Sequence, residues 1–135
     1  MSKIEGHCLC GAVSYAAEAQ PMATLICHCR NCQRQSGSAF SVNVVVPTDS
    51  IVTQGTVKTF TDAADSGNTV ARQFCPTCGS PLFSRLSANP AITVIKAGTL
   101  DDTSAVQPGA QLWCDSRQAW VRLEGDMPEM AKNPA

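Results

Sequence analysis

Cys75-Pro76-Thr77-Cys78-Gly79 is the stretch of sequence that says most about the fold. Its CxxC spacing places two thiolates at chelating distance for zinc, and the flanking proline and glycine favour a tight turn around the metal. Two further clusters, Cys8-Leu9-Cys10 and Cys27-His28-Cys29-Arg30-Asn31-Cys32, bring seven of the eight cysteines into three short segments. The seven divide most naturally into a set of four and a set of three.

The set of four joins the CxxC motif to the CxC motif near the start of the chain. Each of these two motifs is followed directly by glycine, Gly11 and Gly79. Glycine adopts the positive φ that turns backbone amides toward a ligating sulfur. Four thiolates close a tetrahedral zinc to substrates. We therefore expect a structural zinc on Cys8, Cys10, Cys75 and Cys78.

The set of three, Cys27, Cys29 and Cys32, lies within six residues at a predicted strand-to-helix transition. A helix N-terminus favours negative charge. Three protein ligands leave the fourth position of a tetrahedral zinc open to water or a thiol. The alternative is that His28, His7 or Cys114 completes the shell and makes this second zinc structural as well; residue types alone leave both readings open.

An open position would favour thiol chemistry. Zinc binds an added thiol as the thiolate and holds it against an electrophile, and a site rich in thiolates suits a small aldehyde better than water activation. Arg30 and Arg34 could then bind carboxylates of an acidic thiol, or they could form a solvated helix face. His28, placed between two ligands, is expected to point away from the sulfurs, and Cys114 to pack as a small apolar side chain.

Bulk properties limit the alternatives. The 135 residues fit one domain, and no leader or membrane-spanning run is visible, so we expect a cytoplasmic protein. In a reducing compartment, clustered cysteines bind metal more often than they form disulfides. Ten Lys and Arg against eleven Asp and Glu form no basic stripe, which argues against a nucleic-acid partner. An iron–sulfur cluster is a weaker alternative to zinc.

Short β-prone runs between turn signals predict a mainly β fold. One short helix is expected from Cys29 to Gln35, ended by Gly37, with a second turn near residues 115–118 and a loose tail from about residue 126. Trp113, Trp120 and Phe40 are expected in the core. The predicted strands are Val13–Ala16, Met22–Ile26, Ala39–Val46, Val57–Thr61, Val70–Phe74, Leu82–Leu86, Ala91–Ala97 and Gln111–Cys114.

The three cysteine motifs, in order and spacing, resemble the glutathione-dependent formaldehyde-activating enzyme family, which also contains centromere protein V. The resemblance runs from about Gly6 to Met127 and includes Gly37 and Trp120. One departure is Gln111, at a position where relatives often carry histidine. The motifs that carry the resemblance are Gly6-His7-Cys8-Leu9-Cys10-Gly11-Ala12-Val13, Cys27-His28-Cys29-Arg30-Asn31-Cys32 and Phe74-Cys75-Pro76-Thr77-Cys78-Gly79.

The resemblance implies a β-tent of packed antiparallel sheets with two zinc sites. Because a three-thiolate site can lose its metal, we expect the second site to be partly occupied. It implies a structural zinc on the set of four cysteines and a catalytic zinc on Cys27, Cys29 and Cys32. It further implies a carbon–sulfur lyase in which the sulfur of glutathione joins the catalytic zinc and formaldehyde adds reversibly, giving S-hydroxymethylglutathione. The alternative is a non-catalytic zinc module that binds a partner or buffers metal.

Overall fold

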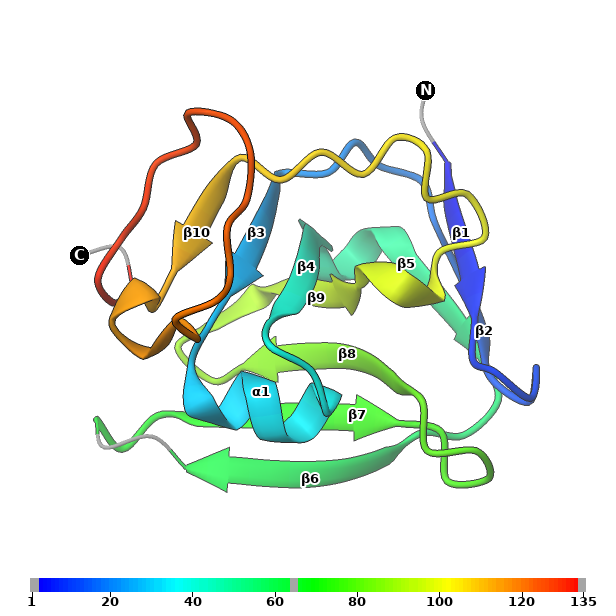
Figure 1. Cartoon of the computed structure of the whole chain (residues 1–135). Coiled ribbons are helices and arrows are strands. Elements are labelled where there is room, and N and C mark those ends of the chain that lie inside the picture. Colours follow the sequence, from blue (N-terminus) through cyan, green and yellow to red (C-terminus); the bar gives the residue numbers. More distant parts are fainter. Residues whose placement is uncertain (1–2, 64–65, 134–135) are drawn as a thin grey trace.

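Two β-sheets and one short helix build the chain (Figure 1), and the computed structural model describes residues 3–63 and 66–133. An antiparallel sheet of three strands has the order β1-β2-β5. A sheet of seven strands has the order β10-β3-β4-β9-β8-β7-β6, in which only the β10–β3 pair is parallel. The strands are β1 (Ile4–His7), β2 (Ser14–Ala17), β3 (Ala23–Cys27), β4 (Ser41–Pro47), β5 (Ile51–Gln54), β6 (Lys58–Ala63), β7 (Thr69–Phe74), β8 (Pro81–Leu86), β9 (Asn89–Lys96) and β10 (Ala110–Leu112).

The mainly β architecture predicted from the sequence is confirmed, and each predicted run overlaps a strand. Two strands were missed. β1 is only four residues long and contains a glycine. β5 is also four residues long and directly follows a turn that begins after Pro47, so its short apolar run was not recognised as a strand. The described residues also form 3-10 turns: η1 (Thr48–Ser50), η2 (Ala97–Thr99) and η3 (Cys114–Ser116).

The α-helix α1 (Arg30–Ser36) begins and ends where the sequence indicates. Cys29 is its N-cap, and the Cys29 sulfur accepts a hydrogen bond from the backbone N–H of Cys32. Gly37 ends it in the left-handed conformation, with φ of 64°. Figure 1 shows α1 in front of the lower strands of the large sheet, and side-chain contacts to β6 and β7 place it against them.

The core lies between the two sheets. Tyr15 of β2 packs edge-to-face on Phe83 of β8, with ring centroids 5.2 Å apart. Gly6 of β1 lies so close to Tyr15 and Thr99 that a methyl group would collide with both. Cys8 and Cys75, from two of the cysteine motifs, belong to the same buried cluster. The rest of that cluster consists of Val13, Val44, Val46, Leu82, Ile95 and Ala97.

Residues 128–132 differ from the loose tail that was expected. The backbone N–H of Gln111 donates to the carbonyl of Pro128 at 2.9 Å, and the N–H of Met130 donates back to the carbonyl of Gln111 at 2.8 Å. The expectation rested on proline content, which gives no information on whether the amides of the other residues find partners elsewhere in the fold. Residues 134 and 135 of the predicted tail lie outside the described residues.

Candidate metal centres

Four cysteines from two distant loops converge as the sequence predicts. Cys8 and Cys10 follow β1 in the small sheet, and Cys75 and Cys78 follow β7 in the large sheet. The four sulfurs all lie within 4.8 Å of one another. The Leu9 backbone N–H donates to the Ser80 hydroxyl at 3.0 Å and holds the two loops together. This four-cysteine cluster therefore connects the two sheets.

Hydrogen-bond donors surround the four-cysteine cluster, and the pKa is lowered at Cys8 and Cys78 but raised at Cys10, whose sulfur lies beside the other three. Backbone N–H groups point at the sulfurs of Cys8 and Cys75, at 3.3 and 3.4 Å, from Val13 and Thr77. The Ser80 hydroxyl, 3.2 Å from the Cys78 sulfur, together with backbone donors, lowers the pKa of Cys78 to about 5. Gly11 and Gly79, both with φ of 82°, form the turns that aim the amides. Four converging thiols with such donors fit a closed metal site.

Three cysteines form a second cluster at the junction of β3 and α1. Cys27 ends β3, Cys29 caps α1 and Cys32 lies in its first turn. Their sulfurs also lie within 4.8 Å of one another. Among the described residues, no further His, Cys, Asp or Glu atom joins this group. The three-cysteine cluster therefore fits a metal that keeps a coordination position for a ligand from outside the chain.

The three residues that could have completed this shell lie elsewhere. His7 is paired with Asp101, its Nδ1 2.7 Å from the carboxylate. The Cys114 sulfur contacts the Gln111 carbonyl at 3.8 Å. His28 is fully buried and, as expected, does not join the three sulfurs. Its Nε2 lies 2.8 Å from Oε1 of Gln111, and this hydrogen bond fixes the orientation of the ring.

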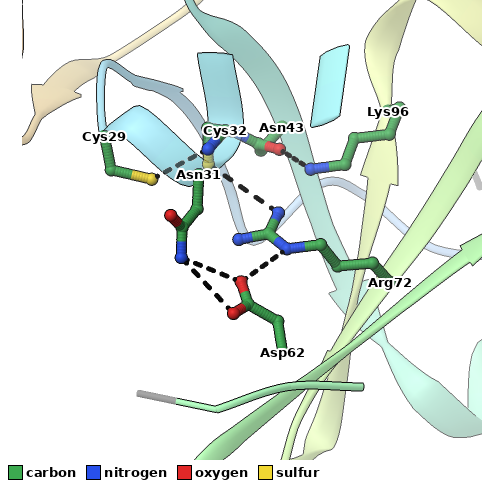
Figure 2. Close-up of polar contacts among 7 residues, drawn as sticks. All are labelled: Cys29, Asn31, Cys32, Asn43, Asp62, Arg72 and Lys96. Atoms are coloured by element: carbon green, nitrogen blue, oxygen red, sulfur yellow. Dashed lines mark hydrogen bonds and ion pairs between the residues drawn. The ribbon is translucent and has the colours of Figure 1, made fainter. Parts of the chain in front are cut away.

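Two cations that sequence reasoning missed face the three-cysteine cluster from the large sheet (Figure 2). Arg72 of β7 has its Nη1 4.0 Å from the Cys32 sulfur and its Nε 3.0 Å from Asp62. Lys96 of β9 donates to the side chain of Asn43 at 2.7 Å. Each is the single charged residue in its predicted strand, and a lone charge in an otherwise uncharged strand is the signal that could have found both.

These neighbours change the protonation of the cluster. Hydrogen bonds from Cys27 and Cys29 lower the pKa of Cys32, and Ser41 and the charge of Lys96 lower it further. The hydrogen bonds of Cys27 with Cys29 and Cys32, together with burial, raise the pKa of Cys27. Burial lowers the pKa of Arg72, but the interactions of its guanidinium with Cys32 and Asp62 outweigh this effect, so the pKa of Arg72 is raised. The cluster therefore starts ionising at Cys32, next to two cations.

A pocket of about 450 Å³ opens beside Cys29. Arg72 and Trp113 line it, and so does Arg30, one of the two arginines singled out from the sequence. Arg30 and Arg34 together line a shallower depression next to it. Trp120 is 70% exposed in that second depression, so its expected place in the core was wrong.

The expected core positions of Trp113 and Phe40 are only partly met. Trp113 is half-buried, and its indole N–H donates to Asn133 at 2.7 Å. Phe40 is also half-buried and lies edge-on to the His28 ring, with centroids 5.5 Å apart. Both aromatic residues therefore flank the three-cysteine segment.

Comparisons with known proteins agree with this arrangement. The family profile of the glutathione-dependent formaldehyde-activating enzyme matches residues 3–116. A Penicillium rubens protein named for the same activity is 33% identical over 85 residues, which cover 62% of this chain and 44% of that protein. The chain thus spans less than half the length of that curated relative.

A solved structure shares the fold. The crystal structure of a Rhodobacter sphaeroides protein superimposes with a TM-score of 0.61 at 19% identity, and the match covers 93% of this chain and 98% of that one. None of the helices in the described part of the chain has the length and apolar character needed to cross a membrane. With the profile match over most of its length, the chain belongs to the glutathione-dependent formaldehyde-activating enzyme family.

Proposed function

We propose that this chain is a zinc-dependent carbon–sulfur lyase of the S-hydroxymethylglutathione synthase type, which adds a thiol reversibly to a small aldehyde. Glutathione and formaldehyde are the substrates that the family name implies. The observation that carries the proposal is the three-cysteine cluster. It offers three sulfurs, has no fourth ligand of its own among the described residues, and borders a pocket.

The two clusters take different roles in this proposal. Cys8, Cys10, Cys75 and Cys78 hold a structural zinc, and Cys27, Cys29 and Cys32 hold the zinc at the reactive centre. A zinc bound there would supply Lewis acidity that keeps an added thiol ionised near neutral pH. Free thiols at all eight cysteines are compatible with a reducing compartment, and we place the protein in the cytoplasm.

The pocket residues suit an acidic thiol. Arg30 and Arg34 are four residues apart on α1 and therefore lie on one face of the helix. Arg30 lines both the pocket at Cys29 and the depression that contains Arg34. Two guanidinium groups in a row match the two carboxylates of glutathione, because arginine binds carboxylates through paired hydrogen bonds. These two residues would orient the thiol with its sulfur toward Cys29.

The test is to measure how fast glutathione and ¹³C-formaldehyde exchange with their adduct, by NMR, with the zinc-loaded protein at catalytic concentration. We expect exchange well above the spontaneous rate, loss of that acceleration in Cys29→Ser, and full acceleration in Cys114→Ser, because Cys114 lies outside both clusters. An unaltered spontaneous rate with both sites loaded would indicate instead the non-catalytic zinc module.

A further inference from the structure

Arg72 is held more firmly than a surface arginine would be. Its side chain is 8% exposed, and Asp62, which binds its Nε, is 18% exposed. Asn31 of α1 donates to both carboxylate oxygens of Asp62, at 3.0 and 3.4 Å. Figure 2 shows this chain of contacts running from the helix through Asp62 to the guanidinium. The helix and two strands therefore fix the direction in which the guanidinium points.

That direction is toward the reacting centre. With Nε bound to Asp62, Nη1 lies 4.0 Å from the Cys32 sulfur. Arg72 also lines the pocket that Cys29 borders. A ligand that entered this pocket and approached the cysteine sulfurs would therefore meet the outer edge of the guanidinium.

Lys96 supplies a positive charge next to the three-cysteine cluster, so Arg72 is not the sole cation that balances the cluster's negative charge. Lys96 contacts Asn43 on the sheet side and does not line the pocket. Three thiolates and a divalent metal carry a net charge of about −1, which one lysine balances. Asp62 balances Arg72. When an extra thiolate and a developing oxyanion arrive in the pocket, the added negative charge falls next to the guanidinium.

We propose that Arg72 is a catalytic residue whose guanidinium donates hydrogen bonds to the aldehyde oxygen, with Asp62 and Asn31 as positioning residues. This inference rests on the function proposed above. The sulfur lone pair forms the carbon–sulfur bond while the carbonyl π pair moves to oxygen. The resulting alkoxide is held by Arg72 and takes a proton from water, which replaces the proton that the thiol released to solvent. The reverse reaction breaks the same bond.

A binding experiment tests the anion site without turnover. Thioglycolate carries a carboxylate close to its sulfur, near where the oxyanion would form, and 2-mercaptoethanol is its neutral counterpart. Calorimetry on the zinc-loaded protein gives the ratio of the dissociation constants of the two thiols. The two thiols differ in acidity, but this difference is the same for every variant and cancels when the ratios of two variants are compared. We expect Arg72→Met to reduce the preference for thioglycolate by about tenfold. Arg85→Met is the control, because it removes an arginine of the adjacent strand that does not line the pocket. This variant should alter the preference for thioglycolate by less than about twofold.

A kinetic experiment separates catalysis from thiol binding. In the NMR exchange assay, Arg72→Met should lower kcat by about 100-fold and change KM for glutathione by less than about threefold. Asp62→Asn should lower kcat by less, because the guanidinium remains but is no longer fixed. Thermal unfolding checks that each variant is folded. If Arg72→Met is unstable, Arg72→Lys replaces it in the binding experiment; because lysine keeps the positive charge, this variant should retain part of the thioglycolate preference.

The outcomes are distinct. If the wild-type protein binds neither thiol and does not accelerate exchange, the proposed function fails and this inference fails with it. If the wild type is active and Arg72→Met keeps kcat and the thioglycolate preference, only the inference fails. A rise in KM for glutathione with unchanged kcat would make Arg72 a clamp for the thiol's carboxylate and would overturn its role at the aldehyde oxygen.

Discussion

The two cysteine clusters use the same side chain for opposite purposes. The four-cysteine cluster joins segments 65 residues apart, from different sheets, and two of its members belong to the hydrophobic core. The three-cysteine cluster spans six consecutive residues at the junction of β3 and α1 and faces Arg72 and Lys96. Ligands drawn from distant segments stabilise a fold, whereas ligands drawn from one short segment leave the fold largely independent of the metal. Arg72 and a pocket lie beside the three-cysteine cluster.

Loss of a ligand from the four-cysteine cluster should have the largest effect. Cys75→Ser removes a fully buried sulfur that bonds the Cys10 loop. Because a structural zinc contributes folding free energy directly, we expect the free energy of unfolding to fall by more than about 5 kcal/mol, measured by urea denaturation. Cys114→Ser is the control, with an expected cost of about 1 kcal/mol or less.

Loss of a ligand from the three-cysteine cluster should separate folding from binding. Serine is a favourable N-cap, so Cys29→Ser keeps the hydrogen bond that begins α1. We expect the free energy of unfolding to change by about 1 kcal/mol or less and glutathione binding to fall by more than about 100-fold. If Cys29→Ser and Cys75→Ser unfold the chain to the same extent, the division of labour between the clusters is wrong.

Metal removal should proceed in two steps. A chelator should take one zinc per chain from the three-cysteine cluster while the far-ultraviolet circular dichroism stays unchanged, because that cluster borders an open pocket. The second zinc should leave only together with the β signal. Simultaneous release of both metals with unfolding would show that the two clusters form one cooperative unit.

The glycine turn at the four-cysteine cluster gives the smallest of these effects. Gly79 has φ of 82°, and no atom lies within 4 Å of an added Cβ. Gly79→Ala should therefore cost only the backbone strain, about 1–2 kcal/mol in unfolding free energy. Gly98→Ala, at an ordinary φ and also in open space, should be neutral or slightly stabilising. Equal melting temperatures for the two variants would exclude a strained turn at the metal loop.

The two clusters also differ from their surroundings in how far the sequence predicts them. Cysteine spacing is a local property, so the motifs alone predicted both groups of converging cysteines, and Gly37 alone predicted the end of α1. Arg72 and Lys96 reach the cluster from strands far along the chain, so only the pairing of strands reveals them. The hydrogen bonds between residues 128–132 and the segment that contains β10 likewise become visible only in the fold.

We infer that four cysteines close one metal site and that three cysteines leave the other site open. The most direct test is to load the protein with Co²⁺ and titrate glutathione while recording the thiolate-to-cobalt charge-transfer absorbance. Seven protein thiolates belong to the two clusters. We expect the absorbance to rise by about one-seventh as an eighth thiolate binds, and we expect Cys29→Ser to abolish the rise. An unchanged spectrum in the wild-type protein would contradict the open site.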